Sequence, residues 1–224
     1  MSFLSQLRRA WVTIQVPGTT SERIPATYVE YPSDGLPPVP ADIASLDWLR
    51  QATRHPEDYL ARAAEAASGD LSAKTVADLL GAGTSLPDDF TQFLADGLRD
   101  RLRSATDSYF DLGDSTVAVD GGRLLHLISD SQWTYHWLLY LGDDGSSAVV
   151  GSGFPAGFSL EPEEAAGYRE EDREYVVVAD SFSEFVWRWW MDNDVFYRTE
   201  VEHIALTPSQ QTYVTRYGHP AKLS

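Results

Sequence analysis

Gly121–Gly153, GGRLLHLISDSQWTYHWLLYLGDDGSSAVVGSG, is the stretch that decides the fold of this 224-residue chain. Three runs within it, Arg123–Ser129, Trp133–Leu141 and Ser147–Ser152, are rich in apolar, aromatic or β-branched residues, and polar turns separate them. This pattern predicts a meander of three consecutive strands. Gly142-Asp143-Asp144-Gly145 favours a tight hairpin, because Asp and Gly tolerate the positive φ that such turns require.

The middle strand, Trp133–Leu141, carries large side chains on both of its faces. We therefore expect it to lie at the centre of its sheet and to be covered on both sides. The best candidate for the cover is the aromatic segment SFSEFVWRWWMDND, residues 181–194, where Ser181 and Glu184 predict a capping box at a helix start. Its buried stripe is expected at Phe182, Phe185, Val186, Trp189 and Asn193. Trp187 and Trp190 flank that stripe and are either further core, which we favour, or an exposed partner site.

The remaining hydrophobic pattern places most of the predicted helices before the meander. These helices are Asp42–Thr53, Glu57–Ala67, Ser72–Leu80 and one that starts at Leu86-Pro87 and runs to Leu102. The predicted strands are Ala10–Val16, Ile24–Tyr31, Ser108–Leu112, Ser115–Val119 and Tyr175–Ala179, with short edge strands at Val201–Leu206 and Thr212–Tyr217. The expected fold class is α+β, with a mainly antiparallel, twisted sheet covered by the helices that begin at Ser181 and Leu86.

A proline-rich segment, Tyr31–Pro40, contains four prolines in ten positions and interrupts regular structure. We expect residues 1–70 to form an N-terminal extension, a loose hairpin plus helices, that packs on or beside the α+β domain of residues 71–224. A chain of this length buries roughly 70% of its unfolded surface, so it needs no disulfide or metal to hold a core.

The chain is strongly acidic, with 34 acidic and 17 basic residues and a formal net charge of −17. A phosphate backbone would be repelled, so we expect no direct nucleic-acid binding. The acidity either serves solubility or attracts a basic macromolecular partner. The highest acidic density lies within Gly153–Glu174, an expected irregular stretch that is either a solvated loop or part of an interface. Its acidic residues are Glu161, Glu163, Glu164, Glu170, Glu171, Asp172 and Glu174.

Few sequence features point to catalysis or metal binding. The absence of Cys excludes thiolate nucleophiles and fits a reducing cytoplasm, and we expect neither a signal peptide nor a membrane span. Gly151-Ser152-Gly153 lacks the context of a nucleophile elbow. His126 and His136 can meet across neighbouring strands, either as a two-His site or, as we favour, as satisfied sheet histidines. We therefore predict a non-enzyme without cofactor or metal, although a carboxylate pair for hydrolysis cannot be picked out among so many acids.

The order of these pieces resembles the SUKH superfamily, which includes bacterial immunity proteins and fungal cell-wall regulators of the Smi/Knr type. In that group an LP helix start precedes a strand meander, which is followed by a helix with a small residue and phenylalanines at its start. The resemblance covers roughly residues 72–205, and the acidic stretch before YVVVA and Gly97 within the first helix depart from it. The matching positions are Leu86, Pro87 and Phe90, then Ser181, Phe182, Phe185 and Trp189.

The resemblance implies a bacterial, cytoplasmic immunity protein of a toxin–antitoxin pair, which neutralises a cognate toxin such as a nuclease by covering its basic surface. The alternative is a Smi/Knr-type regulatory scaffold that binds endogenous partners, and a third reading is a hydrolase with an unrecognised carboxylate pair. The family has no shared catalytic constellation to carry over. From charge density and aromatic excess, the predicted partner-binding residues are Glu163, Glu164, Glu170, Glu171, Asp172, Glu174, Trp187 and Trp190.

Overall fold

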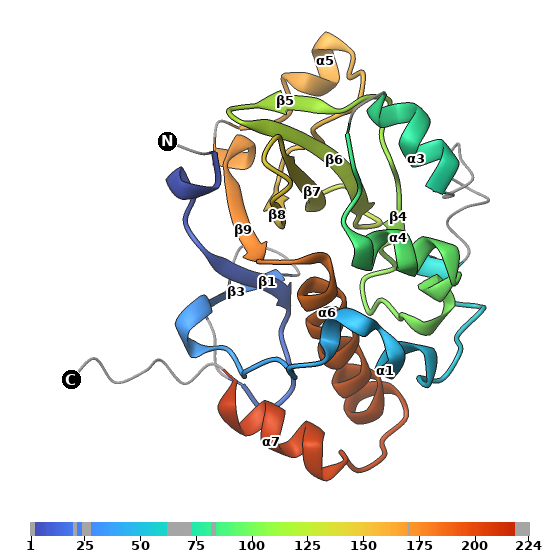
Figure 1. The fold of residues 1–224 in the computed structure, drawn as a ribbon. Helices are drawn as coiled ribbons and strands as arrows, with labels where there is room; N and C mark the ends of the chain where they lie inside the picture. Colours follow the sequence, from blue (N-terminus) through green and yellow to red (C-terminus); the bar gives the residue numbers. More distant parts are fainter. Residues whose placement is uncertain are drawn as a thin grey trace.

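A computed structural model describes residues 3–19, 22–23, 28–61, 73–81, 84–169 and 171–217 (Figure 1). Its larger sheet is antiparallel and has the strand order β4-β6-β7-β8-β9, with β5 also paired to β6. The strands are β4 (Tyr109–Phe110), β5 (Val117–Val119), β6 (Gly122–Ser129), β7 (His136–Gly142), β8 (Ser147–Ser152) and β9 (Tyr175–Ala179). The predicted α+β class and the predicted meander are confirmed.

The middle strand of the meander begins three residues later than predicted, because Asp130 organises a longer turn. The Asp130 carboxylate accepts hydrogen bonds from the main-chain N–H of Thr134 at 2.6 Å and from its hydroxyl at 2.8 Å. Trp133 closes this turn with a φ of 57°, in the left-handed region. Pairing with β6 and β8 therefore starts only at His136.

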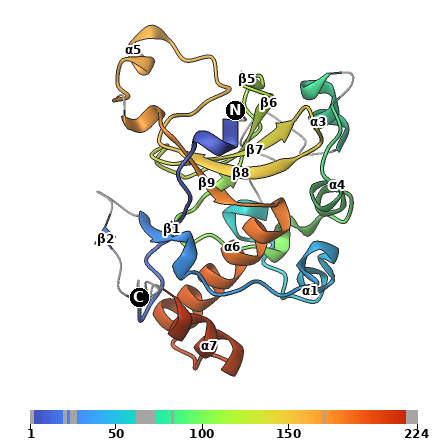
Figure 2. The ribbon, with the colours of Figure 1, turned by 60° about the vertical axis from the view of Figure 1, so that its left-hand side comes forward.

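Both faces of β7 are covered, as its side chains predict. On one face Trp137 packs against Trp189 of α6 (Phe182–Phe196), with their ring centroids 4.9 Å apart. On the other face Phe3 of the short 3₁₀ helix η1 (Phe3–Gln6) stacks on Tyr140, at 5.7 Å between centroids. Figure 2 shows α6 on one side of the sheet and the N-terminal turn on the other.

The start of α6 differs in detail from the predicted capping box. Ser181 accepts a hydrogen bond from the Glu184 N–H at 3.1 Å, as predicted. The Glu184 carboxylate, however, accepts from the N–H of Asp180, 3.0 Å away, and pairs with Arg188. The predicted stripe of Phe182, Phe185, Val186, Trp189 and Asn193 is buried.

The N-terminal region shares a core with the rest of the described chain. Its three-stranded sheet has the order β1-β3-β2, formed by β1 (Ala10–Ile14), β2 (Glu22–Arg23) and β3 (Tyr28–Pro32). It adjoins the larger sheet where the N–H of Val177 donates to the carbonyl of Arg8 at 3.0 Å. Trp11 of β1 meets Phe185 of α6 at 5.9 Å between centroids. The predicted boundary at residue 70 lies outside the described residues.

The predicted N-terminal helices are shorter than expected, because left-handed residues interrupt them. Leu46, with a φ of 56°, divides the predicted helix Asp42–Thr53 into the turn η3 and the helix α1. Gly97, with a φ of 61°, separates α4 from the turn η4 and so ends the helix predicted to reach Leu102. Most of the predicted helix Glu57–Ala67 lies outside the described residues. The bounds are η2 (Ser33–Gly35), η3 (Ile43–Ser45), α1 (Asp47–Arg50), α3 (Ala73–Leu80), α4 (Asp88–Ala95), η4 (Leu98–Arg101), α5 (Pro162–Ala165) and η5 (Glu171–Arg173).

The C-terminal prediction of two edge strands, at Val201–Leu206 and Thr212–Tyr217, is wrong. The chain leaves α6 through a π-helical turn, Tyr197–Val201, and then forms the helix α7 (Pro208–Arg216). A capping box starts α7, since Thr207 accepts from the N–H of Gln210 and the Gln210 side chain accepts from the N–H of Thr207. This local capping outweighs the weak alternation that suggested strands.

A buried carboxylate, Asp192, joins three distant elements. It accepts hydrogen bonds from the indole N–H of Trp11 at 2.6 Å and from the hydroxyls of Tyr213 at 2.7 Å and Tyr217 at 3.1 Å. These bonds connect β1, α6 and the C-terminal helix region. Burial raises the pKa of Asp192 to about 6, although the three donors oppose that rise.

We predict that Asp192→Ala lowers the free energy of unfolding by about 3 kcal/mol, because it leaves the Trp11 N–H and two tyrosine hydroxyls without their acceptor. Urea unfolding measures the loss. The control is Glu200→Ala, which removes an exposed carboxylate just beyond α6 and should change stability by less than about 0.5 kcal/mol. Equal stability of the two variants would contradict a structural role for Asp192.

Candidate functional site

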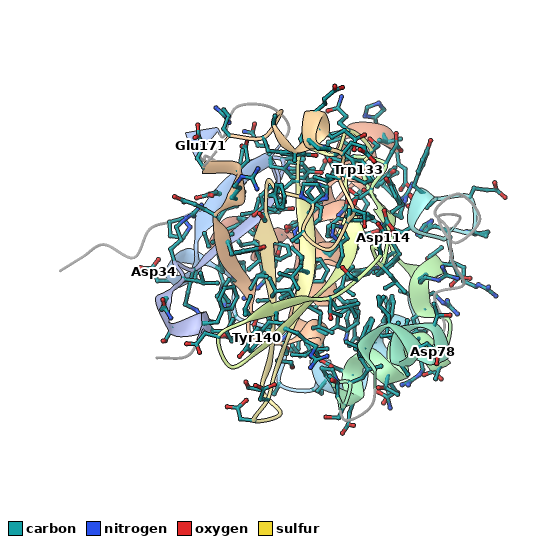
Figure 3. All side chains as sticks on the ribbon, turned by 90° about the horizontal axis from the view of Figure 1, so that it is seen from above. Asp34, Asp78, Asp114, Trp133, Tyr140 and Glu171 are labelled. Carbon is teal, nitrogen blue, oxygen red and sulfur yellow. The ribbon has the colours of Figure 1, made fainter. Side chains whose placement is uncertain are left out.

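An open groove of about 650 Å³ lies where β7 and β9 begin and β8 ends. Figure 3 shows two residues of this groove, Glu171 and Trp133, toward the same edge of the molecule. Its walls combine aromatic rings with charged groups. The residues that matter here are Arg8, Tyr28, Glu30, Trp133, Tyr135, Ser152, Gly153, Tyr168, Arg169, Glu171, Asp172, Glu174 and Val176.

The aromatic floor depends on a glycine in the neighbouring strand. The Tyr135 ring lies over Gly151, where a Cβ atom would stand only 2.3 Å from the phenolic oxygen. The ring also contacts Tyr28 and Trp137, at centroid distances of 5.5 and 5.1 Å. Gly151 therefore allows a close approach that no other residue permits.

The hydroxyl of Tyr135, a residue that lines the groove, has no hydrogen-bond partner among the described residues. The Tyr28 hydroxyl, by contrast, donates to Thr106 at 3.2 Å. Burial raises the pKa of Tyr135 above its ordinary value, so the phenol stays neutral at physiological pH. It can both donate and accept.

The acidic wall of the groove is formed by residues 167–169 and 171–174 and is held at its base by Asp172. The Ser152 hydroxyl donates to the main-chain carbonyl of Asp172 at 3.1 Å. The Arg169 guanidinium pairs with Asp172 at 3.2 Å and with Glu171 at 3.1 Å. Hydrogen bonding to Arg169 lowers the pKa of the Asp172 carboxyl. Asp172 is therefore part of the wall's structure, while Glu174 is exposed and its carboxylate has no ion pair within the described ranges.

The opposite wall is a paired arginine and glutamate. The two guanidinium nitrogens of Arg8 contact the two carboxylate oxygens of Glu30 at 2.6 and 2.5 Å. This bidentate geometry fixes the orientation of both side chains. It also joins the chain just before β1 to β3, so the N-terminal region completes the groove.

Trp133 stands on the rim in an unfavourable backbone conformation. Its φ of 57° belongs to a position where hairpin turns favour Gly or Asn, and a bulky side chain there costs about 1–2 kcal/mol. The indole packs against Phe158 at 4.9 Å and His136 at 5.7 Å between centroids, and its N–H donates to the Tyr109 hydroxyl. Strained residues held in this way concentrate at functional sites.

The structure brings together only some of the predicted partner-binding residues. Glu171, Asp172 and Glu174 line the groove, whereas Glu163 and Glu164 are exposed on α5 and Glu170 lies outside the described residues. Trp187 is buried against Tyr213, with the ring centroids 5.3 Å apart. Trp190 is half-buried against Trp48, at 5.5 Å. Both tryptophans therefore pack between helices, away from the groove lining.

Sequence reasoning missed the aromatic half of the groove, formed by Tyr28, Trp133, Tyr135 and Tyr168. Two local features could have indicated it. Trp133 occupies a turn where a small residue is expected, and Gly151 sits inside an otherwise apolar strand. A glycine in a strand often marks a close approach by another group.

The two sheet histidines do meet, through a serine. His126 Nε2 lies 3.0 Å from the Ser129 hydroxyl, which lies 3.1 Å from His136 Nδ1, and all three side chains are buried. His126 Nδ1 donates to the Ala156 carbonyl at 3.1 Å, so Ser129 donates to His126 and accepts from His136. His136 Nε2 makes no hydrogen bond to the described residues. Burial lowers the pKa of His136, and the Trp133 main chain opposes that fall.

This histidine chain has no exposed reacting atom. Burial lowers the pKa of His126 to about 3 and that of His136 to about 4, so both are neutral near pH 7. No group of three or more potential metal-ligating side chains occurs in the part of the chain that the structure describes. The arrangement fits the favoured reading of structural sheet histidines, with Ser129 between them, except that His136 Nε2 has no hydrogen-bond partner among the described residues.

We predict that acid destabilises the fold through these histidines. The unfolded chain binds a proton at each near pH 6.5 and the folded chain does not, so stability falls below pH 6.5 by about 1.4 kcal/mol per pH unit for each histidine. His136→Phe should remove the contribution of one of the two histidines, which is about half of the slope that the pair causes. Chemical unfolding between pH 7.5 and 4.5 measures it.

The control for this titration is His203→Asn, which removes an exposed imidazole at a left-handed position that Asn tolerates. Its comparison with His136→Phe separates the loss of a buried imidazole from the loss of an exposed one. Asp192, whose raised pKa gives the opposite slope between about pH 4 and 6, is present in all three proteins and cancels. An unchanged slope in His136→Phe would refute the assignment.

We predict that Gly151→Ala displaces the Tyr135 ring and costs about 1–3 kcal/mol of stability, because the new methyl group overlaps the ring. A double-mutant cycle with Tyr135→Ala checks the cause. In the Tyr135→Ala background Gly151→Ala should cost less than about 0.5 kcal/mol. Additive losses would show that the ring is not the clashing group.

No family model, curated protein or solved structure matches this chain significantly. Among the described helices, none combines the length and apolar character needed to cross a membrane. The resemblance to the SUKH superfamily stays a prediction, and the site has to be interpreted from its own residues.

Proposed function

We propose that this chain is a non-enzymatic protein-binding module that docks a basic protein partner against the groove and its acidic wall. The observation that carries the proposal is the joining of Glu171 and Glu174 with the rings of Trp133, Tyr135 and Tyr168 along one groove. Carboxylates can steer and orient a basic partner, while buried aromatic rings commonly supply the binding energy.

Within that class we propose an immunity-type role, in which the chain neutralises a cognate toxin such as a nuclease. A nuclease presents a basic surface to phosphate, and a chain with a net charge of −17 would be drawn to the same surface and compete with the substrate. The proposal places the chain in the cytoplasm, in keeping with the absence of cysteine, and assigns it no nucleic-acid ligand.

Two alternatives differ in the partner or in the chemistry. A regulatory scaffold would use the same groove for an endogenous protein, and a toxin gene next to this one would favour immunity over that role. For the hydrolase alternative, the carboxyl whose pKa burial raises to about 6, Asp192, is enclosed by Trp11, Tyr213 and Tyr217. It lies away from the groove lining and so does not supply a general acid there.

The test is a charge reversal at exposed carboxylates of the acidic wall and of the neighbouring helix α5. The partner is first recovered by co-purification with the tagged chain from the native cell. We predict that the triple variant Glu163→Lys, Glu171→Lys and Glu174→Lys slows its association about tenfold at low salt and flattens the salt dependence. Asp172 is left intact because it holds the wall together.

The matched control reverses three exposed carboxylates on other elements, Asp34, Asp120 and Glu200, and so makes the same change in net charge. Its association rate should fall less than about threefold, because these charges lie neither in the groove lining nor on α5. Stopped-flow measurement at several salt concentrations gives both rates. Equal slowing by the two triple variants would mean that net charge, and not this surface, guides the partner.

A further inference from the structure

We propose that the groove receives an arginine side chain of the protein partner, with its guanidinium held between the rim aromatics and Glu174. This inference rests on the proposed function and specifies the anchor that the partner inserts. A volume of about 650 Å³ exceeds one side chain and suits an arginine together with its neighbours in a peptide segment.

The charges of the groove leave room for one cation. Two arginines and four carboxylates line it. Arg8 pairs with Glu30 and its charge also acts on Glu174, while Arg169 pairs with Asp172 and Glu171. Glu174 is exposed, and within the described ranges its carboxylate makes no hydrogen bond or ion pair. An incoming anion would meet the excess of carboxylates, whereas an incoming cation finds in Glu174 a carboxylate without a direct ion pair among the described residues.

The rings and the free phenol match a guanidinium in particular. A guanidinium stacks on aromatic faces and is more weakly hydrated than an ammonium group. The chain uses the same contact elsewhere, with Arg173 at 4.3 Å from the centroid of Phe154 and Arg103 at 3.4 Å from that of Tyr197. The Tyr135 oxygen, which has no hydrogen bond among the described residues, can accept a guanidinium N–H, and Glu174 lines the same groove.

Pre-organisation makes the site ready for a ligand. Gly151 seats the Tyr135 ring, Ser152 holds the acidic wall, and the Arg8–Glu30 pair fixes the far side. Trp133 is kept at the rim in a left-handed conformation by its contacts with Phe158 and His136. Little ordering is then left for the moment of binding, which favours a weak single-residue anchor.

The test uses a blocked five-residue peptide with a central arginine among four glycines. Two matched peptides replace the arginine by lysine or by citrulline, the uncharged analogue of arginine. Binding is followed by NMR at the indole N–H of Trp133, assigned with the variant Trp133→Phe. We expect saturable shifts with the arginine peptide, about threefold weaker binding of the lysine peptide and at least about tenfold weaker binding of the citrulline peptide.

Two variants of the chain locate the contact. Glu174→Gln should weaken binding of the arginine peptide about fivefold. This change in affinity corresponds to the loss of one exposed ion pair of about 1 kcal/mol. The control Glu200→Gln, an exposed carboxylate outside the groove, should leave the affinity unchanged. The arginine anchor would be overturned if the arginine and citrulline peptides caused equal chemical-shift changes at Trp133. It would also be overturned if Glu174→Gln left the affinity for the arginine peptide unchanged.

Failure of this inference can be told apart from failure of the proposed function. If no peptide binds at the groove while the partner still associates and responds to the acidic triple variant, the anchor is refuted and the binding function stands. If the arginine peptide binds with the expected order of affinities, the anchor is supported even where the natural partner proves to be an endogenous protein.

Discussion

The packing of Trp137 is the interaction on which the rest of the structure depends. Its side chain, on the central strand β7, is only 1% exposed and lies against Trp189 of α6 and against Tyr28 and Tyr135. The covering helix and the floor of the groove therefore rest on the same ring. Its indole N–H finds no acceptor among the described residues, a cost that the aromatic contacts have to outweigh. Core and site cannot be altered independently here.

Local patterns were enough to predict the centre of the fold, and non-local contacts explain what was missed. Strand β8 and strand β9 were predicted with their observed bounds, and α6 with its buried stripe, because each depends on side chains within a few residues of each other. The N-terminal strand was predicted, but not its junction with Val177, which lies some 170 positions further along the chain. The capping box at Thr207 was a local feature that the weaker alternation of the C-terminal region concealed.

The site was half predictable for the same reason. Charge density alone pointed to Glu171, Asp172 and Glu174, since acidic residues gathered in one segment stay together in any fold. The aromatic residues converge from β3, from the turn before β7 and from the loop before β9, and no sequence spacing links them. Trp187 and Trp190 were chosen because their helix is rich in aromatic residues. Contacts with neighbouring helices bury Trp187 and half-bury Trp190. Surplus aromatic content is thus a poor guide to an interface when a helix has neighbours on several sides.

The internal ion pairs decide how the net charge of −17 should be understood. Arg169 neutralises much of the acidic wall, and Arg8 neutralises Glu30, so the groove has far less free charge than its composition suggests. If acidity served solubility alone, there would be no reason to place arginines beside these carboxylates, because pairing removes the repulsion that keeps chains apart. Paired charges instead fix the walls and leave Glu174 as an exposed lining carboxylate without a direct ion pair among the described residues. Under the proposed function, such an arrangement would discriminate among partners by geometry as well as by sign, which a uniformly charged surface cannot do.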